Sequence, residues 1–373
     1  MFRLSELIKS TLEDIPSRGH SGSIMIWNFT NRCNLFCHHC YSKADPNNMD
    51  LLSFDEIRKT IPQLIESGIR FVIFSGGEPL IRSDIYDIAQ EMKKHKIMTY
   101  LSTNGMYINE KNVEKIITTF NYIGISIDGK EEVHDYFRGQ KGSYKKAIKA
   151  IKLIQKNGGN AGVRFTLTKE TKDDFYSIFE LVENLNVNKF YISHLVYSGR
   201  GEDNLKIDLT KEERRECVEY IIDKAFDYYN SKKGIDLVTG NMEMDSILLL
   251  KRFEKNYPRK VDDLMRRLKL WGGNNSGIRI GNMDWKGDVK PDPFFPKVIG
   301  NYLKQPFENI WSNTDDEIVN KLREIPRKIS GKCENCKYIS ICNGGSRSRA
   351  YVIHNDLWAE DPSCYLTNEE IKA

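Results

Sequence analysis

Three cysteines near the start of the chain have a spacing suited to metal chemistry. Cys33, Cys37 and Cys40 are separated by three and then two residues. Three thiolates on one short loop can bind three irons of a [4Fe-4S] cluster and leave the fourth iron without a protein ligand. A structural zinc ion would instead need a fourth ligand, which His38 or His39 could supply. The spacing favours a cluster with an open, reactive iron and leaves zinc as an alternative.

A second group of cysteines lies near the C-terminal end of the chain. Its members are Cys333, Cys336, Cys342 and Cys364. Four thiolates are enough to saturate either an iron-sulfur cluster or a zinc ion, so the spacing alone leaves both open. The remaining cysteine, Cys217, shares a helical stripe with Ile221 and Ala225, which predicts buried packing.

Composition and charge exclude several classes of protein. The 373 residues include 56 Lys and Arg and 52 Asp and Glu, and a net charge of +4 is too small to predict a nucleic-acid-binding protein. Charged residues interrupt Met1 to Ile15, which therefore lacks the apolar core of a signal peptide. No window approaches the ~20 apolar residues of a membrane span. We expect a cytoplasmic protein without membrane contact, whose cysteines are metal ligands or buried thiols rather than disulfides.

Short β-rich runs alternate with amphipathic helical patterns in the first half of the chain. The expected strands are Ser23–Thr30, Phe71–Ser75, Met98–Thr103, Tyr122–Asp128, Gly162–Leu167 and Phe190–Val196. Ser53 and Glu56 form a capping box before one helical pattern, and Ser143 opens another. Repeated strand-helix units predict parallel strands joined by right-handed crossovers, with functional residues at the strands' carboxyl ends. Six units are too few for a closed barrel, so we expect an open or partial one.

The pattern changes after about Ser198, which suggests further domains. A long helix over Lys211 to Tyr229 and a Lys/Arg-rich helical stretch precede the Gly- and Asn-rich segment Trp271 to Gly277, a predicted loop and hinge. Short strands near Ile278 to Met283 and Asp288 to Lys290 follow, before the second cysteine group. We divide the chain into an N-terminal segment (1–22), a partial barrel (23–200), a helical linker region (201–275) and a C-terminal α+β domain (276–373).

The first cysteine motif resembles that of a known family. The run Cys33 to Cys40 after the first strand, with His39 at the aromatic position, is similar to the signature of the radical SAM enzymes. The Gly-Gly-Glu-Pro segment 76–79 directly follows the second strand, where that family has its GGEP segment. The resemblance implies a partial (β/α)6 barrel of the radical SAM kind. It also implies a [4Fe-4S] cluster whose open iron binds S-adenosylmethionine, which is cleaved to a 5′-deoxyadenosyl radical.

Polar residues at later strand ends extend the resemblance to the cofactor site. Arg138 resembles the arginine that pairs with the methionine carboxylate of the cofactor. The implied contacts of S-adenosylmethionine are Gly76, Gly77, Glu78, Pro79, Thr103, Asn104, Ser126, Asp128, Arg138 and Thr166. The ends of the third and fourth strands are each weak evidence alone, because polar residues and glycines after a strand commonly make an ordinary turn. The alternative for Arg138 is a surface ion pair.

The C-terminal cysteine group resembles the SPASM/Twitch extension of radical SAM enzymes. That resemblance implies an auxiliary [4Fe-4S] cluster on Cys333, Cys336, Cys342 and Cys364. Such extensions commonly bind two clusters with seven cysteines, whereas only four are available here, so one auxiliary cluster is expected. The implied cofactors are two [4Fe-4S] clusters and S-adenosylmethionine, with a ferredoxin or flavodoxin as the electron donor.

Longer stretches resemble the radical SAM enzymes that trim side chains from the tetrapyrrole didecarboxysiroheme. They are Ser193 to Gly201, Val238 to Asn241, Trp271 to Asn274 and Asp356 to Leu366. One branch of these enzymes removes two acetate groups to give iron-coproporphyrin III in haem biosynthesis, and another removes propionate groups in haem d1 synthesis. The run Cys342-Asn343-Gly344-Gly345 favours the first branch, because the second more often has two glycines directly after this cysteine.

A tetrapyrrole substrate implies binding residues of its own. Its carboxylates need fixed cations, and the planar fork of arginine suits them. The candidate residues are Arg164, Arg200, Arg347 and Arg349 for the carboxylates, and His20 and His194 for the iron. Each arginine alone is more commonly a solvated surface residue, and His194 could equally be a core histidine.

Two other classes of protein remain open. A SPASM peptide maturase shares both cysteine groups, but many such enzymes carry an N-terminal peptide-recognition domain, and only 32 residues precede Cys33. A zinc-stabilised binding or scaffold protein would use both cysteine groups structurally and would be colourless.

Overall fold

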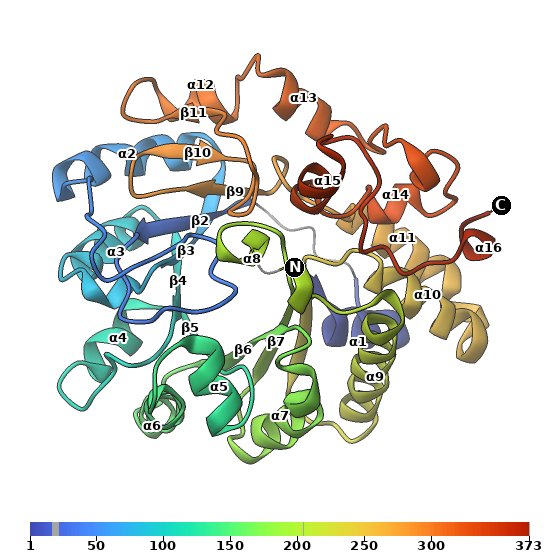
Figure 1. Ribbon diagram of the computed structural model, residues 1–373, viewed down its shortest axis with the longest axis horizontal. Coiled ribbons are helices and arrows are strands. Elements are labelled where there is room, and N and C mark those ends of the chain that lie inside the picture. Colours follow the sequence, from blue (N-terminus) through green and yellow to red (C-terminus); the bar gives the residue numbers. More distant parts are fainter. Residues whose placement is uncertain (17–21, 204, 373) are drawn as a thin grey trace.

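The computed structural model describes residues 1–16, 22–203 and 205–372, which build one continuous mixed sheet covered by helices (Figure 1). The sheet has eleven strands in the order β1-β8-β7-β6-β5-β4-β3-β2-β9-β10-β11. Pairing is parallel from β8 through to β9 and antiparallel at both edges. Because β2 to β8 are neighbours in space in chain order, each step requires a crossover connection.

The six strands predicted from the sequence are all present and confirm the partial barrel. They are β2 (Ser23–Thr30), β3 (Ile69–Gly76), β4 (Met98–Thr103), β5 (Tyr122–Ser126), β6 (Ala161–Leu167) and β7 (Lys189–His194). The helices between and after them are α2 (Phe54–Glu66), α3 (Ile85–Lys94), α4 (Val113–Thr119), α5 (Glu131–Arg138), α6 (Ser143–Lys156), α7 (Lys172–Asn184) and α8 (Arg200–Asp203). The capping box on α2 is confirmed, since Ser53 and Glu56 each accept a hydrogen bond from the other's backbone N–H.

A seventh parallel strand, β8 (Asp236–Gly240), extends the barrel beyond the prediction. Helix α9 (Lys211–Asn230) is its crossover, and β1 (Phe2–Arg3) closes the edge before α1 (Leu4–Leu12). Helices α10 (Asp245–Asn256) and α11 (Val261–Trp271) follow β8. The strand was missed because it is only five residues long and lies among helical patterns.

The C-terminal region joins the opposite edge of the barrel. Strand β9 (Ile280–Met283) pairs in parallel with β2, and β10 (Asp288–Lys290) and β11 (Gly300–Asn301) add an antiparallel ribbon. The remaining helices are α12 (Phe307–Trp311), α13 (Glu317–Arg323), α14 (Ile339–Cys342), α15 (Arg347–His354) and α16 (Asn368–Ile371). In Figure 1 the red segment with α14 lies beside α10 and α11, which it contacts.

The apolar core lies between the sheet and its helices. Trp27 and Phe74 on neighbouring strands are fully buried and stack at a centroid distance of 6.5 Å. Cys217 on α9 is buried in the same core, which confirms its predicted packing role. Every helix in the described ranges is too short or too polar to cross a lipid bilayer.

Candidate active site

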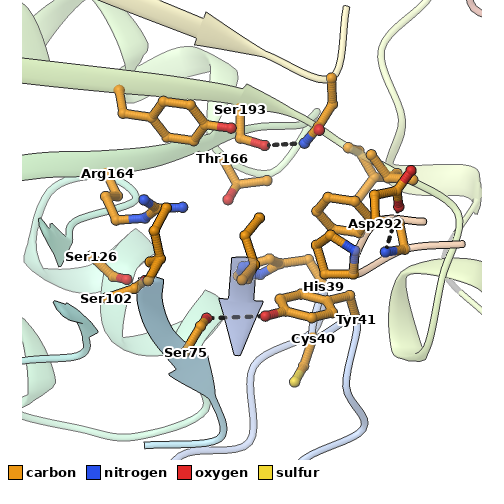
Figure 2. Close-up of a pocket in the computed structure, with 18 of the residues that line it drawn as sticks. His39, Cys40, Tyr41, Ser75, Ser102, Ser126, Arg164, Thr166, Ser193 and Asp292 are labelled. Atoms are coloured by element: carbon orange, nitrogen blue, oxygen red, sulfur yellow. Dashed lines mark hydrogen bonds between the residues drawn. The ribbon is translucent and has the colours of Figure 1, made fainter. Parts of the chain in front are cut away.

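A cavity opens at the carboxyl ends of the parallel strands (Figure 2). About 1640 Å³ within it is not filled by protein atoms. Its walls combine the ends of β3 to β7 with the first cysteine loop, the loop 273–276 and the segment 292–294. This is the edge at which strand-helix units place functional residues.

The first cysteine loop forms one wall of this cavity. Cys33, Cys37 and Cys40 all line it. Arg200 holds the loop in place, because its Nε donates to the Cys37 carbonyl over 2.7 Å and its guanidinium lies 4.1 Å from the centre of the Phe36 ring. Arg200 also lines the cavity, so its expected role as a substrate clamp stays a prediction beside this role in positioning the cysteine loop.

The two glycines of the Gly-Gly-Glu-Pro segment pack directly against that loop. Gly77 donates its N–H to the Thr30 carbonyl over 2.8 Å, and a Cβ atom on Gly77 would overlap the Arg32 carbonyl. Gly76 has a φ of 112°, and a Cβ atom there would overlap the Thr30 carbonyl. Both glycines line the cavity, so their backbone is open to a bound molecule.

Glu78 lies behind the glycines and does not line the cavity. Its Oε1 accepts from Thr103 Oγ1 over 2.8 Å and from Leu80 N over 3.1 Å, and its Oε2 accepts from Asn104 N over 2.8 Å. Burial raises the pKa of Glu78 to about 7, although these hydrogen bonds act to lower it. Glu78 was expected to meet an ammonium group, but both of its oxygens are used within the protein. It ties the ends of β3 and β4 together, and the buried Pro79 starts the short turn beyond it.

Arg138 occupies the space between a buried carboxylate and a cluster cysteine. Its Nε donates to Asp128 Oδ2 over 2.5 Å, and its Nη1 lies 3.7 Å from Cys37 Sγ. Burial alone would lower the pKa of Arg138, but the nearby Asp128 and Cys37 have the larger effect and raise it. The other Asp128 oxygen accepts from Thr166 N over 2.6 Å. Arg138 lines the cavity and Asp128 does not, so Asp128 positions the arginine and would not touch a cofactor itself.

Strands β6 and β7 present alternate residues to the cavity (Figure 2). Arg164 and Thr166 pair in register with Tyr191 and Ser193, and all four line the cavity. The Arg164 guanidinium lies over the Tyr191 ring at 4.6 Å from its centre. Within the described part of the chain, no carboxylate pairs with Arg164, so it is available to an anionic group of a bound molecule. Thr103, Asn104 and Ser126 also line the cavity, and their contact with S-adenosylmethionine stays a prediction.

His194 and His20, the expected iron ligands, have different outcomes. His194 is buried, with Nε2 3.3 Å from Asp245 Oδ2 and Nδ1 3.3 Å from Arg214 Nη1. Both of its ring nitrogens are engaged, which agrees with the alternative of a core histidine and not with an iron ligand. His20 lies outside the described residues.

Arg347 and Arg349 do not face the cavity. Arg347 donates to the carbonyls of Leu357 and Ala359 over 2.8 and 2.6 Å. Arg349 forms a buried ion pair with Asp361, with 2.7 Å between Nη2 and Oδ2. These contacts use both guanidinium groups to stabilise the C-terminal region, so the expectation that Arg347 and Arg349 clamp the substrate is wrong.

Three further residues of the cavity were not assigned to the substrate from the sequence. Tyr191 could have been found, because it alternates with Ser193 on one face of β7. His39 stacks on Phe137 at 4.4 Å, and its Nδ1 is buried with no hydrogen-bond partner among the described residues. Glu243 could not be found from the sequence, because it follows β8, a strand that no sequence pattern indicates.

The second cysteine group surrounds a smaller cavity of its own. Cys333, Cys336, Cys342 and Cys364 line it together with Met244. Within the described ranges, no three His, Cys, Asp or Glu side chains converge as they would around a single metal ion. The four cysteines nevertheless line one cavity, and four thiol ligands suit an iron-sulfur cluster as well as zinc.

The predicted loop after Trp271 lies between the two cavities. Gly273 and Asn274 line the larger cavity, while Asn274 N donates to the Cys342 carbonyl over 3.1 Å. Gly273 has a φ of 67°, and a Cβ atom there would overlap the Cys342 backbone. The loop therefore joins one wall of the strand-end cavity to a residue of the second cysteine group.

The partial barrel, with three cysteines at the carboxyl ends of its strands, defines a radical SAM enzyme, and the radical SAM superfamily matches residues 27–182. The pre-heme d1 synthase of Dinoroseobacter shibae is 35% identical over 99% of this chain and 93% of that protein. The Fe-coproporphyrin III synthase of Methanosarcina barkeri is 34% identical over 93% of this chain and 89% of that protein. The chain belongs to the radical SAM family that contains these two enzymes.

A solved structure shares the fold. Streptococcus suis SuiB bound to S-adenosylmethionine is 18% identical and superimposes with a TM-score of 0.71 over 96% of this chain and 80% of that one. Membership of the radical SAM superfamily implies S-adenosylmethionine and one [4Fe-4S] cluster. The cavity fits both, since three thiols form one wall and the guanidinium of Arg138 and the backbone of two glycines lie beside them.

Proposed function

We propose that this chain removes two acetate side chains from didecarboxysiroheme to give iron-coproporphyrin III in haem biosynthesis. The observation that supports this most directly is the similarity, over nearly the whole chain, to an enzyme named for the product Fe-coproporphyrin III. Similarity to pre-heme d1 synthase supports the same substrate class. Both relatives are named for tetrapyrrole products, so a tetrapyrrole substrate is the common inference.

The geometry of the cavity is compatible with this substrate. Tyr191 and Phe294 supply aromatic surface for a planar ring, and Arg164 supplies a cation for a carboxylate. Of the four arginines expected from the sequence, we assign Arg164 as the carboxylate clamp.

Within this proposal, S-adenosylmethionine supplies a radical able to break an unactivated C–H bond, which acid-base groups cannot do. Cys33, Cys37 and Cys40 would hold the cluster that cleaves it. Arg138, Ser126, Thr166 and the glycine backbone would orient the cofactor, and the cavity walls would exclude water from the radical.

We propose that the second cysteine group binds an auxiliary [4Fe-4S] cluster, and that a ferredoxin or flavodoxin supplies electrons. Four cysteines around one cavity support the cluster. Replacement of Cys364 by Ala tests it, with Cys217→Ala as the matched control. We expect about eight irons in the wild type and the control and about four in the variant. A colourless wild type that contains zinc would contradict both clusters.

A second candidate function has one observation in its favour. The identity to pre-heme d1 synthase, 35%, is as high as that to Fe-coproporphyrin III synthase, 34%. Asn343 favours the deacetylase, and its side chain is engaged, since Oδ1 accepts from Arg327 N over 2.8 Å. A glycine there would keep the backbone, which has a φ of 57°, but would lose that contact.

The deciding experiment is anaerobic reaction of the reconstituted protein with didecarboxysiroheme, S-adenosylmethionine and a reductant, followed by mass analysis. Loss of two acetate groups is the expected outcome. Loss of mass from propionate groups would assign the chain to haem d1 synthesis. An unchanged tetrapyrrole would contradict both functions and would favour a peptide maturase, the remaining enzymatic alternative.

A further inference from the structure

Glu243 and Met244, which are adjacent in the chain, line different cavities. Both residues follow β8. Glu243 lines the strand-end cavity, while Met244 lines the cysteine cavity with its Sδ 3.5 Å from Cys342 Sγ. A group that acts on the substrate at Glu243 is therefore next to the second cysteine group.

Glu243 carries a buried polar atom for which the described residues provide no hydrogen-bond partner. The residue is only 9% exposed, and this atom is its Oε2. Its Oε1 accepts from Asn274 Nδ2 over 3.2 Å. A buried carboxyl group with an unused oxygen in a cavity wall is uncommon and marks a candidate for chemistry.

The position of Glu243 is fixed through Asn274. Besides binding Glu243, Asn274 donates its N–H to the Cys342 carbonyl over 3.1 Å and accepts from Arg327 Nη1 over 2.8 Å. Arg327 is buried and is held in turn by the Asn343 side chain. Because these contacts occupy Oε1, the Oε2 atom is the one left for a bound molecule.

The surroundings favour a carboxyl group that carries a proton. Burial raises the pKa of Glu243, and Asp361 adds to that rise. Arg349 and the Met1 ammonium group act in the opposite direction. The net effect is a raised pKa, which favours the protonated form that a proton donor needs.

The proposed reaction requires a proton inside this cavity. In a reduced pyrrole ring of the substrate, the acetate group is attached to a saturated carbon whose ring neighbour carries a hydrogen atom. Loss of that hydrogen atom to the adenosyl radical leaves an unpaired electron on the ring. The neighbouring C–CH2COO⁻ bond then breaks, the ring gains a double bond, and a carboxymethyl radical leaves. One electron and one proton convert this radical to acetate.

We propose that Glu243 donates this proton to the departing carboxymethyl fragment. The second cysteine group would hold an iron-sulfur cluster that would supply the electron, and Glu243 becomes a carboxylate that solvent reprotonates before the second acetate group is removed. This inference rests on the proposed function. It gives the adjacent positions of Glu243 and Met244 a purpose, because the proton donor would lie beside the second cysteine group.

The test compares the reconstituted wild type with Glu243→Gln and Glu243→Asp in anaerobic reactions in D2O. Iron content and tetrapyrrole binding are measured first, to exclude a loss of structure. In the Glu243→Gln variant we expect one equivalent of 5′-deoxyadenosine to form, while acetate release slows by about 100-fold, the lower end for a positioned proton donor. We also expect an organic radical signal in the electron paramagnetic resonance spectrum of the variant. The acetate from the wild type should contain one deuterium from solvent.

Asp284→Asn is the matched control, because Asp284 is another buried carboxylate, accepts from Lys286 N over 2.8 Å and does not line the cavity. We expect this variant to release acetate at the wild-type rate. Acetate release at the wild-type rate by Glu243→Gln, with normal iron content, would overturn the inference alone. If Glu243→Gln loses iron, the Glu243→Asp variant decides. Its shorter side chain holds the carboxyl group farther from the substrate, so acetate release should slow. An unchanged rate of acetate release would overturn the inference. A wild type that releases no acetate would remove the proposed function and this inference together.

Discussion

Asp128 holds Arg138 in a buried ion pair at the edge of the cavity, with 2.5 Å between Arg138 Nε and Asp128 Oδ2. The same guanidinium reaches to within 3.7 Å of Cys37 Sγ. A fixed cation beside a cluster cysteine can meet the carboxylate of a cofactor bound to that cluster. The orientation of Arg138 therefore depends on a residue that does not itself line the cavity.

Replacement of Asp128 by Asn should weaken both the fold and cofactor binding. The variant leaves the Arg138 charge buried without its partner, which costs about 3–5 kcal/mol of unfolding free energy. We also expect the dissociation constant of S-adenosylmethionine to rise about tenfold or more, which corresponds to about 1.4 kcal/mol. Denaturant unfolding and calorimetric titration measure these two effects.

The matched control for Asp128 is Asp84→Asn. Asp84 also accepts from the Nε and Nη2 atoms of an arginine, Arg82, over 3.0 and 2.6 Å, but Arg82 does not line the cavity. Asp84 is more exposed, so its loss should cost about 1 kcal/mol and leave cofactor affinity unchanged. Equal effects of the two substitutions on cofactor affinity would show that Arg138 does not contact the cofactor.

Replacement of Arg164 by Ala should weaken tetrapyrrole binding and spare the cofactor. A charge-assisted hydrogen bond contributes about 1.5–3 kcal/mol, so we expect a roughly 10- to 100-fold rise in the dissociation constant, read from the absorption spectrum of the bound tetrapyrrole. Arg164→Lys should recover part of the affinity, because lysine keeps the charge but not the planar fork. Arg215→Ala, which removes an arginine bound to Glu219 and Glu370 away from the cavity, is the control. An Arg164→Ala variant with wild-type affinity would exclude the clamp.

Two neighbouring glycines allow the loop between the cavities to be tested. Gly272 and Gly273 have φ values of 79° and 67°, so alanine at either position costs about 1–2 kcal/mol of left-handed strain. Only Gly273→Ala would also push against the Cys342 backbone, since no atom lies within 4 Å of a Cβ on Gly272. We expect Gly273→Ala to lose about four irons and Gly272→Ala to keep its full content. Equal iron content in the two variants would contradict the proposed link between the loop and the second cysteine group.

The buried Glu78 predicts a dependence of stability on pH. Its pKa is about 7 in the folded protein, against 4.5 ordinarily, so between these values the folded state holds a proton that the unfolded chain has lost. The free energy of unfolding should therefore fall as the pH rises through this window, by about 3 kcal/mol from this group. Glu78→Gln removes the titration. Denaturant unfolding of both proteins from pH 4.5 to 7 should show the wild type losing stability relative to the variant, and parallel curves would contradict the raised pKa.

The local parts of the site could be predicted from the sequence. The spacing of Cys33 to Cys40 lies within one loop, and the six strands and the α2 capping box follow from periodicity over a few residues. Such features are set by backbone geometry and by neighbours along the chain, which a sequence displays directly. The same reasoning missed β8, because a short buried strand in a helical region lacks a distinctive period.

Sequence alone thus determined the radical-forming loop, the strand-end edge where it lies, and a second group of four cysteines. Tertiary structure alone decided which polar side chains face the cavity. Arg164, Arg200, Arg347 and Arg349 look alike in the sequence, yet only Arg164 lacks a role in holding the protein together. Glu243 lies in the cavity wall, although no sequence pattern around it indicates that position. The reason is physical, because burial and the pairing of charges depend on residues far apart in the chain, which only packing brings together.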